Sequence, residues 1–255
     1  MRVRILFVAI CLLLVSPKAN AQDWEIGALL GASGYMGDLN PENPFAYNDW
    51  GAGLSGKYNL NSTWGVRANF SYSRIHADDR HSSVVQRQIR GLNFAGYVAE
   101  AAVLVDFNFF RFLPQRGRNS YTPYLFAGVG GIHFYPKWSD LSGGGEWNEA
   151  TLGEIREAIN DDPDGTEDIR KPTRYAIAIP FGAGFKYNLR GPWTVGVEVG
   201  YRQAFTDYLD AVSGSRPQES KRWLQGDGRP NDSYMTAGFT ISYTIFKGGC
   251  PEWRN

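Results

Sequence analysis

Apolar and polar residues alternate with a period of two along several stretches of this chain. The stretch WTVGVEVGY, residues 193–201, places its aromatic and branched residues on one face and Thr, Gly and Glu on the other. The stretches 175–187 and 235–245 alternate in the same way. Because successive side chains of a strand point to opposite sides, this period predicts β-strands with one apolar face.

Eight segments carry this pattern, and several are longer than the five or six residues usual in soluble strands. They are 24–33, 51–60, 63–73, 93–107, 121–132, 175–187, 193–204 and 233–246. A tilted strand needs about 9–11 residues to cross a bilayer. We therefore predict an all-β fold, an eight-stranded antiparallel transmembrane β-barrel of the outer membrane that spans residues 22–246.

The connections between these segments alternate in length. Asn61-Ser62 and 189–191 lie in tight turns and 108–120 in a moderate one, whereas four connections are long, namely 34–50, 74–92, 133–174 and 205–232. Tyr or Trp stands at the ends of several apolar stripes, as in the aromatic girdles of outer-membrane barrels. In such barrels the short turns are periplasmic, so we expect both termini in the periplasm and the long loops outside the cell.

The chain begins with a segment typical of export. Arg2 and Arg4 precede an apolar run from Ile5 to Val15, and Ala19-Asn20-Ala21 fits a cleavage site. This layout predicts a signal peptide over residues 1–21. Its apolar run is shorter than the roughly 20 residues of a membrane-spanning helix.

Composition and motifs argue against several classes of function. The net charge is zero, so the sequence gives no sign of nucleic-acid binding. We find no nucleophile motif and no phosphate-binding glycine loop, and we expect no catalytic activity and no cofactor. His76 and His81 flank two aspartates, and 161–168 is acidic, but both patterns are more typical of solvated loops than of metal sites.

Charged residues occupy the polar face of the predicted strands. They are four acids and four bases: Glu25, Glu100, Asp106, Glu198, Lys57, Arg67, Lys186 and Arg202. An eight-stranded barrel is just wide enough for side chains to fill it, so interior charges must pair. The balanced set favours an ion-paired plug, and the alternative is an acid–base site or a narrow conduction path.

Two segments at the expected periplasmic rim have unusual composition. The stretch 107–118 is aromatic and basic, and its Arg111, Arg116 and Arg118 could meet either lipid phosphates or an acidic partner. The tail, residues 247–255, carries Cys250, Pro251 and Trp253. Cys250 is the only cysteine after the predicted cleavage site, so it is either a free thiol or bonded to another chain in the oxidising periplasm.

Two short motifs resemble a known family. The stretch GASGYMGDLN, residues 31–40, and the combination of Tyr243 with Cys250-Pro251 are similar to PorG-type outer-membrane proteins of the type IX secretion system, a DUF6089-like group. The resemblance implies a small barrel that associates with a periplasmic ring of PorK-like lipoproteins and PorN-like proteins. The loop 133–174 has no counterpart in that pattern.

The resemblance and the strand pattern together give the expected function. We expect a structural, non-enzymatic component of a protein secretion machine, embedded in outer-membrane lipid, which docks its partners through Cys250, Pro251, Trp253 and the three arginines. Docking through Cys250 would be covalent if the thiol forms a disulfide with the PorK-like or PorN-like partner. The alternative is an OmpA-like barrel whose long external loops bind ligands or surfaces.

Overall fold

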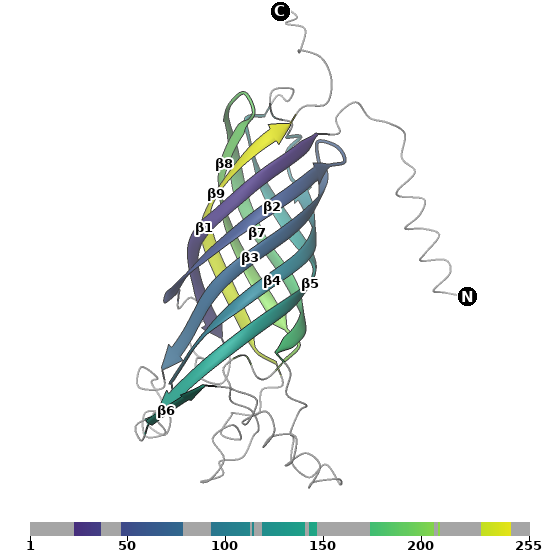
Figure 1. The fold of residues 1–255 in the computed structure, drawn as a ribbon. Coiled ribbons are helices and arrows are strands. Elements are labelled where there is room, and N and C mark those ends of the chain that lie inside the picture. The colour runs from purple at the N-terminus through teal and green to yellow at the C-terminus, as the bar shows by residue number, and fades with distance from the viewer. Residues whose placement is uncertain are drawn as a thin grey trace, which may run out of the picture.

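The computed structural model describes residues 23–36, 47–78, 93–112, 114, 119–140, 143–146, 174–206, 209 and 231–245. They form antiparallel strands only (Figure 1). The strands are β1 (Trp24–Met36), β2 (Asp49–Asn59), β3 (Trp64–Asp78), β4 (Asn93–Asn108), β5 (Tyr121–Asp140), β6 (Gly143–Glu146), β7 (Tyr175–Arg190), β8 (Trp193–Ala204) and β9 (Ser233–Ile245). Among the described residues, no helix is long and apolar enough to cross a membrane.

Eight of these strands close into a barrel. Each pairs with its neighbours along the chain, β5 pairs with β7, and β1 pairs with β9 along its whole length, from Trp24 opposite Ile245 to Met36 opposite Ser233. The remaining strand, β6, pairs only with the end of β5. The fold is therefore the predicted eight-stranded antiparallel barrel, and closure leaves none of the eight strands with an unpaired edge.

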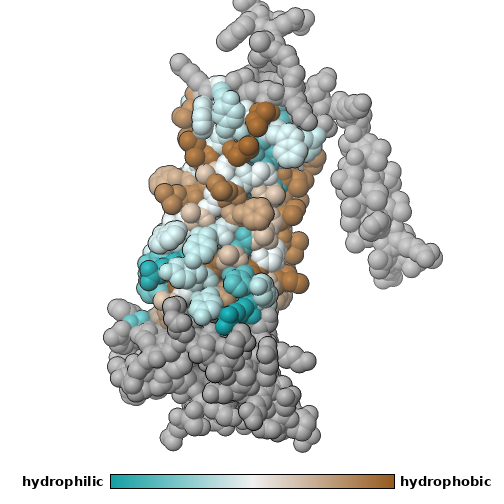
Figure 2. Space-filling view, in the orientation of Figure 1, coloured by the Kyte–Doolittle hydropathy of each residue, from teal (hydrophilic) through white to brown (hydrophobic). Residues whose placement is uncertain are grey.

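The barrel wall alternates between an outward apolar face and an inward polar one. Outward positions such as Leu54, Phe70 and Phe239 are 66%, 64% and 76% exposed. Figure 2 shows hydrophobic side chains over much of the wall and hydrophilic ones gathered toward the end that carries the long loops. Exposed apolar surface of this extent is normal only where lipid covers it.

Aromatic pairs ring the barrel near both ends. The end with the short turns carries Trp24–Tyr58, Trp64–Phe107 and Trp193–Tyr243, with ring centroids 4.9–5.1 Å apart. The loop end carries Trp50–Tyr72, Tyr72–Tyr97 and Phe181–Tyr201. Trp193 and Tyr201 begin and end the outward stripe of β8. With a rise of about 3.3 Å per residue and a tilt of about 40°, these two rings lie about 20 Å apart along the barrel axis, close to the apolar band of outer-membrane barrels.

The expected strand starts are mostly accurate, whereas several strands run past their expected ends into the long loops. The strands β1, β4, β5, β7, β8 and β9 begin at the predicted residues, but β1, β3 and β5 extend past their predicted ends to Met36, Asp78 and Asp140. The loop 133–174 is thus partly strand, because β5 continues into it as far as Asp140 and pairs there with β6. The predicted strands stop too early because the sequence there has a loop-like composition. Barrel strands commonly project beyond the apolar band, where that composition is compatible with a strand. Within the same loop, Leu152, Ile155 and Ile159 stand at helical spacing and predict a short helix over residues 149–159, which lies outside the described residues.

Glycine makes the closing seam possible. A Cβ added to Gly31 of β1 would lie 2.1 Å from the Ala237 carbonyl oxygen and 2.3 Å from the Gly238 Cα of β9. Those separations are far below any contact between real atoms, so only glycine lets β1 and β9 approach this closely. The first residue of the GASGYMGDLN motif therefore has a structural role in barrel closure.

Candidate functional site: the charged barrel interior and its two rims

Inward positions of six strands bring the eight charged residues into the barrel, and all eight are at most 8% exposed. They reach the interior because each lies on the face opposite the apolar stripe of its strand, where period-two alternation directs it. Burying a charge in this way requires a partner of opposite sign. The described contacts divide the set into two networks.

The first network lies toward the turn end and is centred on Arg67. Its Nη1 donates a hydrogen bond to Glu198 Oε2 at 2.6 Å, and its Nε lies 3.3 Å from Asp106 Oδ1. Asp106 also accepts from Lys57 Nζ at 2.8 Å. The Tyr124 hydroxyl donates to the same Glu198 oxygen at 2.7 Å. Two cations thus face two carboxylates in one continuous chain of contacts.

Glu25 and Lys186 complete this end of the interior. Glu25 accepts hydrogen bonds from Ser242 Oγ at 2.5 Å and from Asn59 Nδ2 at 3.5 Å. The Lys186 ammonium lies 4.9 Å from the Phe112 ring centroid and 5.0 Å from that of Tyr124, which are cation–π distances. Phe112 comes from the turn after β4, is 4% exposed, and is tied by its N–H to the Ser62 carbonyl of the β2–β3 turn. The turn between β4 and β5 therefore folds inward over the charged layer.

The second network lies nearer the loop end and is centred on Glu100. Its carboxylate accepts from the Tyr234 hydroxyl at 2.7 Å and from Ser71 Oγ at 3.4 Å, and it lies 3.6 Å from Arg202 Nε. Arg202 also donates to Thr236 Oγ1. Every member is an inward-facing residue of β3, β4, β8 or β9, so this network links both sides of the barrel across its interior.

An apolar layer follows at the loop end. Tyr35 and Phe94 pack edge to face with ring centroids 4.7 Å apart, and Ile75, Val98 and Phe134 are each 1% exposed. The Tyr35 hydroxyl donates to Asp232 Oδ1 at 2.7 Å, and the other Asp232 oxygen accepts from the Leu209 N–H at 3.0 Å. The two described ends of the last long loop, at Leu209 and Asp232, are thereby held together over the mouth of the barrel and tied to β1.

Little free space remains around the first network. The interior pocket beside Glu25, Lys57, Arg67 and Asp106 measures about 50 Å³, which is room for only a few water molecules. The arrangement fits the ion-paired plug better than a conduction path. Within the described residues no group of three or more His, Cys, Asp or Glu side chains is arranged to hold a metal ion.

The rim residues expected to bind a partner are only partly described. Arg111 is exposed and follows Phe109 and Phe110, which are 55% and 42% exposed beside the turn-end aromatic ring. Arg116, Arg118, Cys250, Pro251 and Trp253 lie outside the described residues, as do the signal peptide and the tail. The structure therefore places one of the six expected docking residues.

Sequence reasoning missed the uncharged partners of the buried acids. Tyr124 and Tyr234 each donate to a buried carboxylate, whereas the sequence pattern assigns tyrosine only to the girdles. Their positions carried a usable signal, because both share the inward face of their strand with polar residues such as Thr122 and Thr236. The contact of Asp49 with the outward residues Arg74 and His76 was missed as well, since a contact between two strands is not visible in one sequence.

The fold and its apolar exterior define the class of protein: this is a β-barrel of the outer-membrane type. The family model "Domain of unknown function (DUF6089)" matches residues 3–142 and 159–252. The chain belongs to this family. No curated protein matches it.

Solved structures similar to this chain include outer-membrane barrels. The attachment invasion locus protein Ail of Yersinia pestis, in complex with the heparin analogue sucrose octasulfate, is 15% identical over 88% of this chain and 99% of its own, with a TM-score of 0.44. A major outer-membrane protein of Thermus thermophilus is 10% identical over 88% of this chain and 100% of its own, with a TM-score of 0.45. The outer-membrane enzyme PagL is 14% identical over 87% and 99%, with a TM-score of 0.34.

Proposed function

We propose that this protein is a non-catalytic structural component of the type IX protein secretion machinery, which anchors a periplasmic ring of PorK-like and PorN-like proteins to the outer membrane. The observation that carries the proposal is the filled interior. Its charges are matched in number and its two ends are covered by aromatic side chains, so the wall and the rims are the surfaces left for a function.

The turn end is the proposed docking surface. The described chain enters at Asp23 and leaves at Ile245 on the same end as the short turns 60–63 and 191–192 (Figure 1). Short turns are periplasmic in barrels of this class, which supports a periplasmic position for both ends of the chain. Arg111, exposed on this end between apolar side chains, supplies positive charge for an acidic surface of the partner.

The tail supplies a second contact in this proposal. Cys250 forms a disulfide with a thiol of the ring protein, a reaction that removes two electrons and two protons, which the disulfide-forming machinery of an oxidising periplasm accepts. Trp253 supplies an apolar anchor beside it. The resemblance of residues 31–40 and of Cys250-Pro251 to PorG-type proteins supports the identity of the partner.

The test compares cells that carry the native chain, Cys250→Ser, Arg111→Ala, Arg111→Lys and a chain ending at residue 246. Secretion of a type IX cargo and co-isolation of the ring with the barrel are measured, and non-reducing electrophoresis detects the covalent adduct. We expect truncation to abolish co-isolation and secretion, Cys250→Ser to remove the adduct, and Arg111→Lys to behave more like the native chain than Arg111→Ala. Normal secretion and co-isolation after truncation, with folded barrel present in the membrane, would overturn the proposal.

A further inference from the structure

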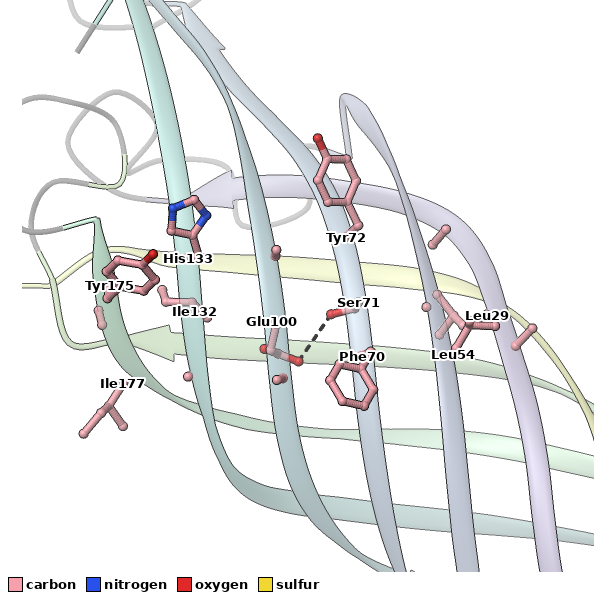
Figure 3. Close-up of a pocket in the computed structure, with 17 residues that line it drawn as sticks. Leu29, Leu54, Phe70, Ser71, Tyr72, Glu100, Ile132, His133, Tyr175 and Ile177 are labelled. Atoms are coloured by element: carbon pink, nitrogen blue, oxygen red, sulfur yellow. Dashed lines mark hydrogen bonds between the residues drawn. The ribbon is translucent and has the colours of Figure 1, made fainter. Parts of the chain in front are cut away.

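The lipid-facing wall contains an elongated apolar hollow of about 970 Å³, which crosses the strands from β1 through β5 to β7. Figure 3 shows Phe70 and Tyr72 of β3 on one side of β4, and His133 of β5 with Tyr175 and Ile177 of β7 on the other. From β2 to β7 it spans four strand spacings, or about 19 Å at about 4.8 Å each. This length suits an extended acyl chain.

Small residues at outward positions create the hollow. Across the barrel, the paired residues Ala52, Tyr72, Ala99, His133 and Tyr175 form one row. The adjacent row is Leu54, Phe70, Ala101, Gly131 and Ile177. Bulky side chains thus stand on both sides of a floor of alanine and glycine. A wall designed only to contact lipid tails has no need for such a depression, although small residues alone would not identify an occupant.

A charged cluster lies beside the hollow toward the loop end. Arg74 is the next outward residue after Tyr72 on β3, and its Nε lies 3.4 Å from Asp49 Oδ1. His76 follows on the same face, and its Nδ1 contacts the other Asp49 oxygen. The side chains of Arg74 and His76 are 44% and 38% exposed, respectively. Arg74 is directly opposite Tyr97, which stacks on Tyr72 at 5.4 Å, so the cluster lies at the level of the loop-end aromatic ring.

We propose that this hollow and cluster bind one phosphate-bearing lipid of the leaflet on the loop side. Its acyl chain lies in the hollow, and its phosphate accepts hydrogen bonds from Arg74, with His76 beside it. The depth is consistent, because aromatic rings of barrels lie where lipid headgroups begin. A guanidinium carries five N–H donors in a fork that matches phosphate. Because Arg74 contacts Asp49 through Nε, its other N–H donors remain for a second anion.

A lipid fits these observations better than a second barrel. The hollow is long and apolar, and beside it the half-exposed guanidinium of Arg74 lies at the level of the loop-end aromatic ring. An apolar groove with a cation at the headgroup level matches a single anionic amphiphile. Asp49 works against an incoming phosphate while holding Arg74 in place. Removal of the Asp49 charge should therefore strengthen phosphate binding, an outcome that a purely structural role of the cluster does not predict.

The experiment uses native mass spectrometry of the full processed chain, delipidated in detergent and then exposed to phosphatidic acid or to diacylglycerol with the same acyl chains. We expect one phosphatidic acid per barrel and about tenfold weaker retention of diacylglycerol, as for loss of one charge-assisted contact. Arg74→Gln should remove this preference, and Asp49→Asn should strengthen it. Ala99→Phe should abolish retention of both lipids by filling the hollow, whereas Ala183→Phe, an outward position of β7 outside the hollow, should not.

Three results would overturn the proposal. They are equal retention of the two lipids by the native chain, equal loss in Ala99→Phe and Ala183→Phe, and a dimer of barrels that Ala99→Phe dissociates. The last result would assign the hollow to a second copy of the chain. A heat-modifiable band in electrophoresis confirms in each case that the variant barrel is folded. The outcome is independent of any secretion partner, so it is separate from the test of the proposed function.

Discussion

Removal of Arg67 tests whether the interior network stabilises the barrel as a set of matched charges. Arg67→Met leaves Glu198 with the Tyr124 hydroxyl as its remaining described partner, while Asp106 keeps Lys57 at 2.8 Å. Two charges about 4 Å apart attract by about 4 kcal/mol at an effective dielectric constant of about 20. Removal of one partner of a buried ion pair costs about 3–5 kcal/mol, because the remaining charge stays buried without compensation. We therefore expect Arg67→Met to lower the free energy of unfolding by about 3–5 kcal/mol.

The double variant separates charge imbalance from lost packing. Arg67→Met with Glu198→Gln removes one cation and one anion, so we expect it to be less destabilised than the sum of the two single variants by at least about 2 kcal/mol. The assay is urea unfolding in lipid vesicles followed by tryptophan fluorescence. Additive losses, or a single-variant loss below about 1 kcal/mol, would show that the carboxylate is not held by Arg67. The reasoning that treats the interior as an ion-paired plug would then fail.

Three further predictions follow from the wall and the mouth of the barrel. Gly31→Val should prevent β1 from pairing with β9 and abolish the heat-modifiable folded form, whereas Gly56→Ala, with no atom within 4 Å of the added Cβ, should fold normally. Val103→Arg, at an outward position that is 56% exposed, should cost about 2–4 kcal/mol in vesicle unfolding if it lies near the bilayer centre, and a loss near zero would place this part of β4 outside the apolar band. Tyr35→Phe removes the 2.7 Å hydrogen bond to Asp232 and should cost about 1–3 kcal/mol, with proteolysis near Leu209 accelerated; unchanged cleavage would contradict a mouth closed by this contact.

Much of the fold was predictable because one physical rule governs every strand. Lipid outside and side chains inside require strict alternation, so the stripe Trp193 to Tyr201 identifies both the strand β8 and its outward face. The same rule selects Glu198 as an inward residue. The pairing of Arg67 with Glu198 was not predictable, because β3 and β8 are far apart in sequence and the register around the barrel fixes which inward side chains meet.

The hollow and its charged cluster were not predictable for a related reason. Ala99, Ala101 and Gly131 are unremarkable along their own strands, and they form a depression only because the register places them beside Phe70 and Ile177. Asp49 was expected in a loop, and the extension of β2 to that residue is what brings it to Arg74. Local sequence specifies which way a side chain points, whereas cross-strand geometry specifies its neighbours.

The motif that suggested the family has a structural explanation over its first half. Gly31 allows the closing seam, Ser33 donates to the Trp50 carbonyl at 2.9 Å, and Tyr35 binds Asp232 across the mouth. Each of these residues faces inward, so the motif is what a barrel with this seam and this mouth requires. Family membership inferred from it is therefore evidence about the fold first. Evidence about secretion has to come from residues that the barrel does not need for folding. Of the six residues expected to dock a partner, exposed Arg111 is the one that the structure describes.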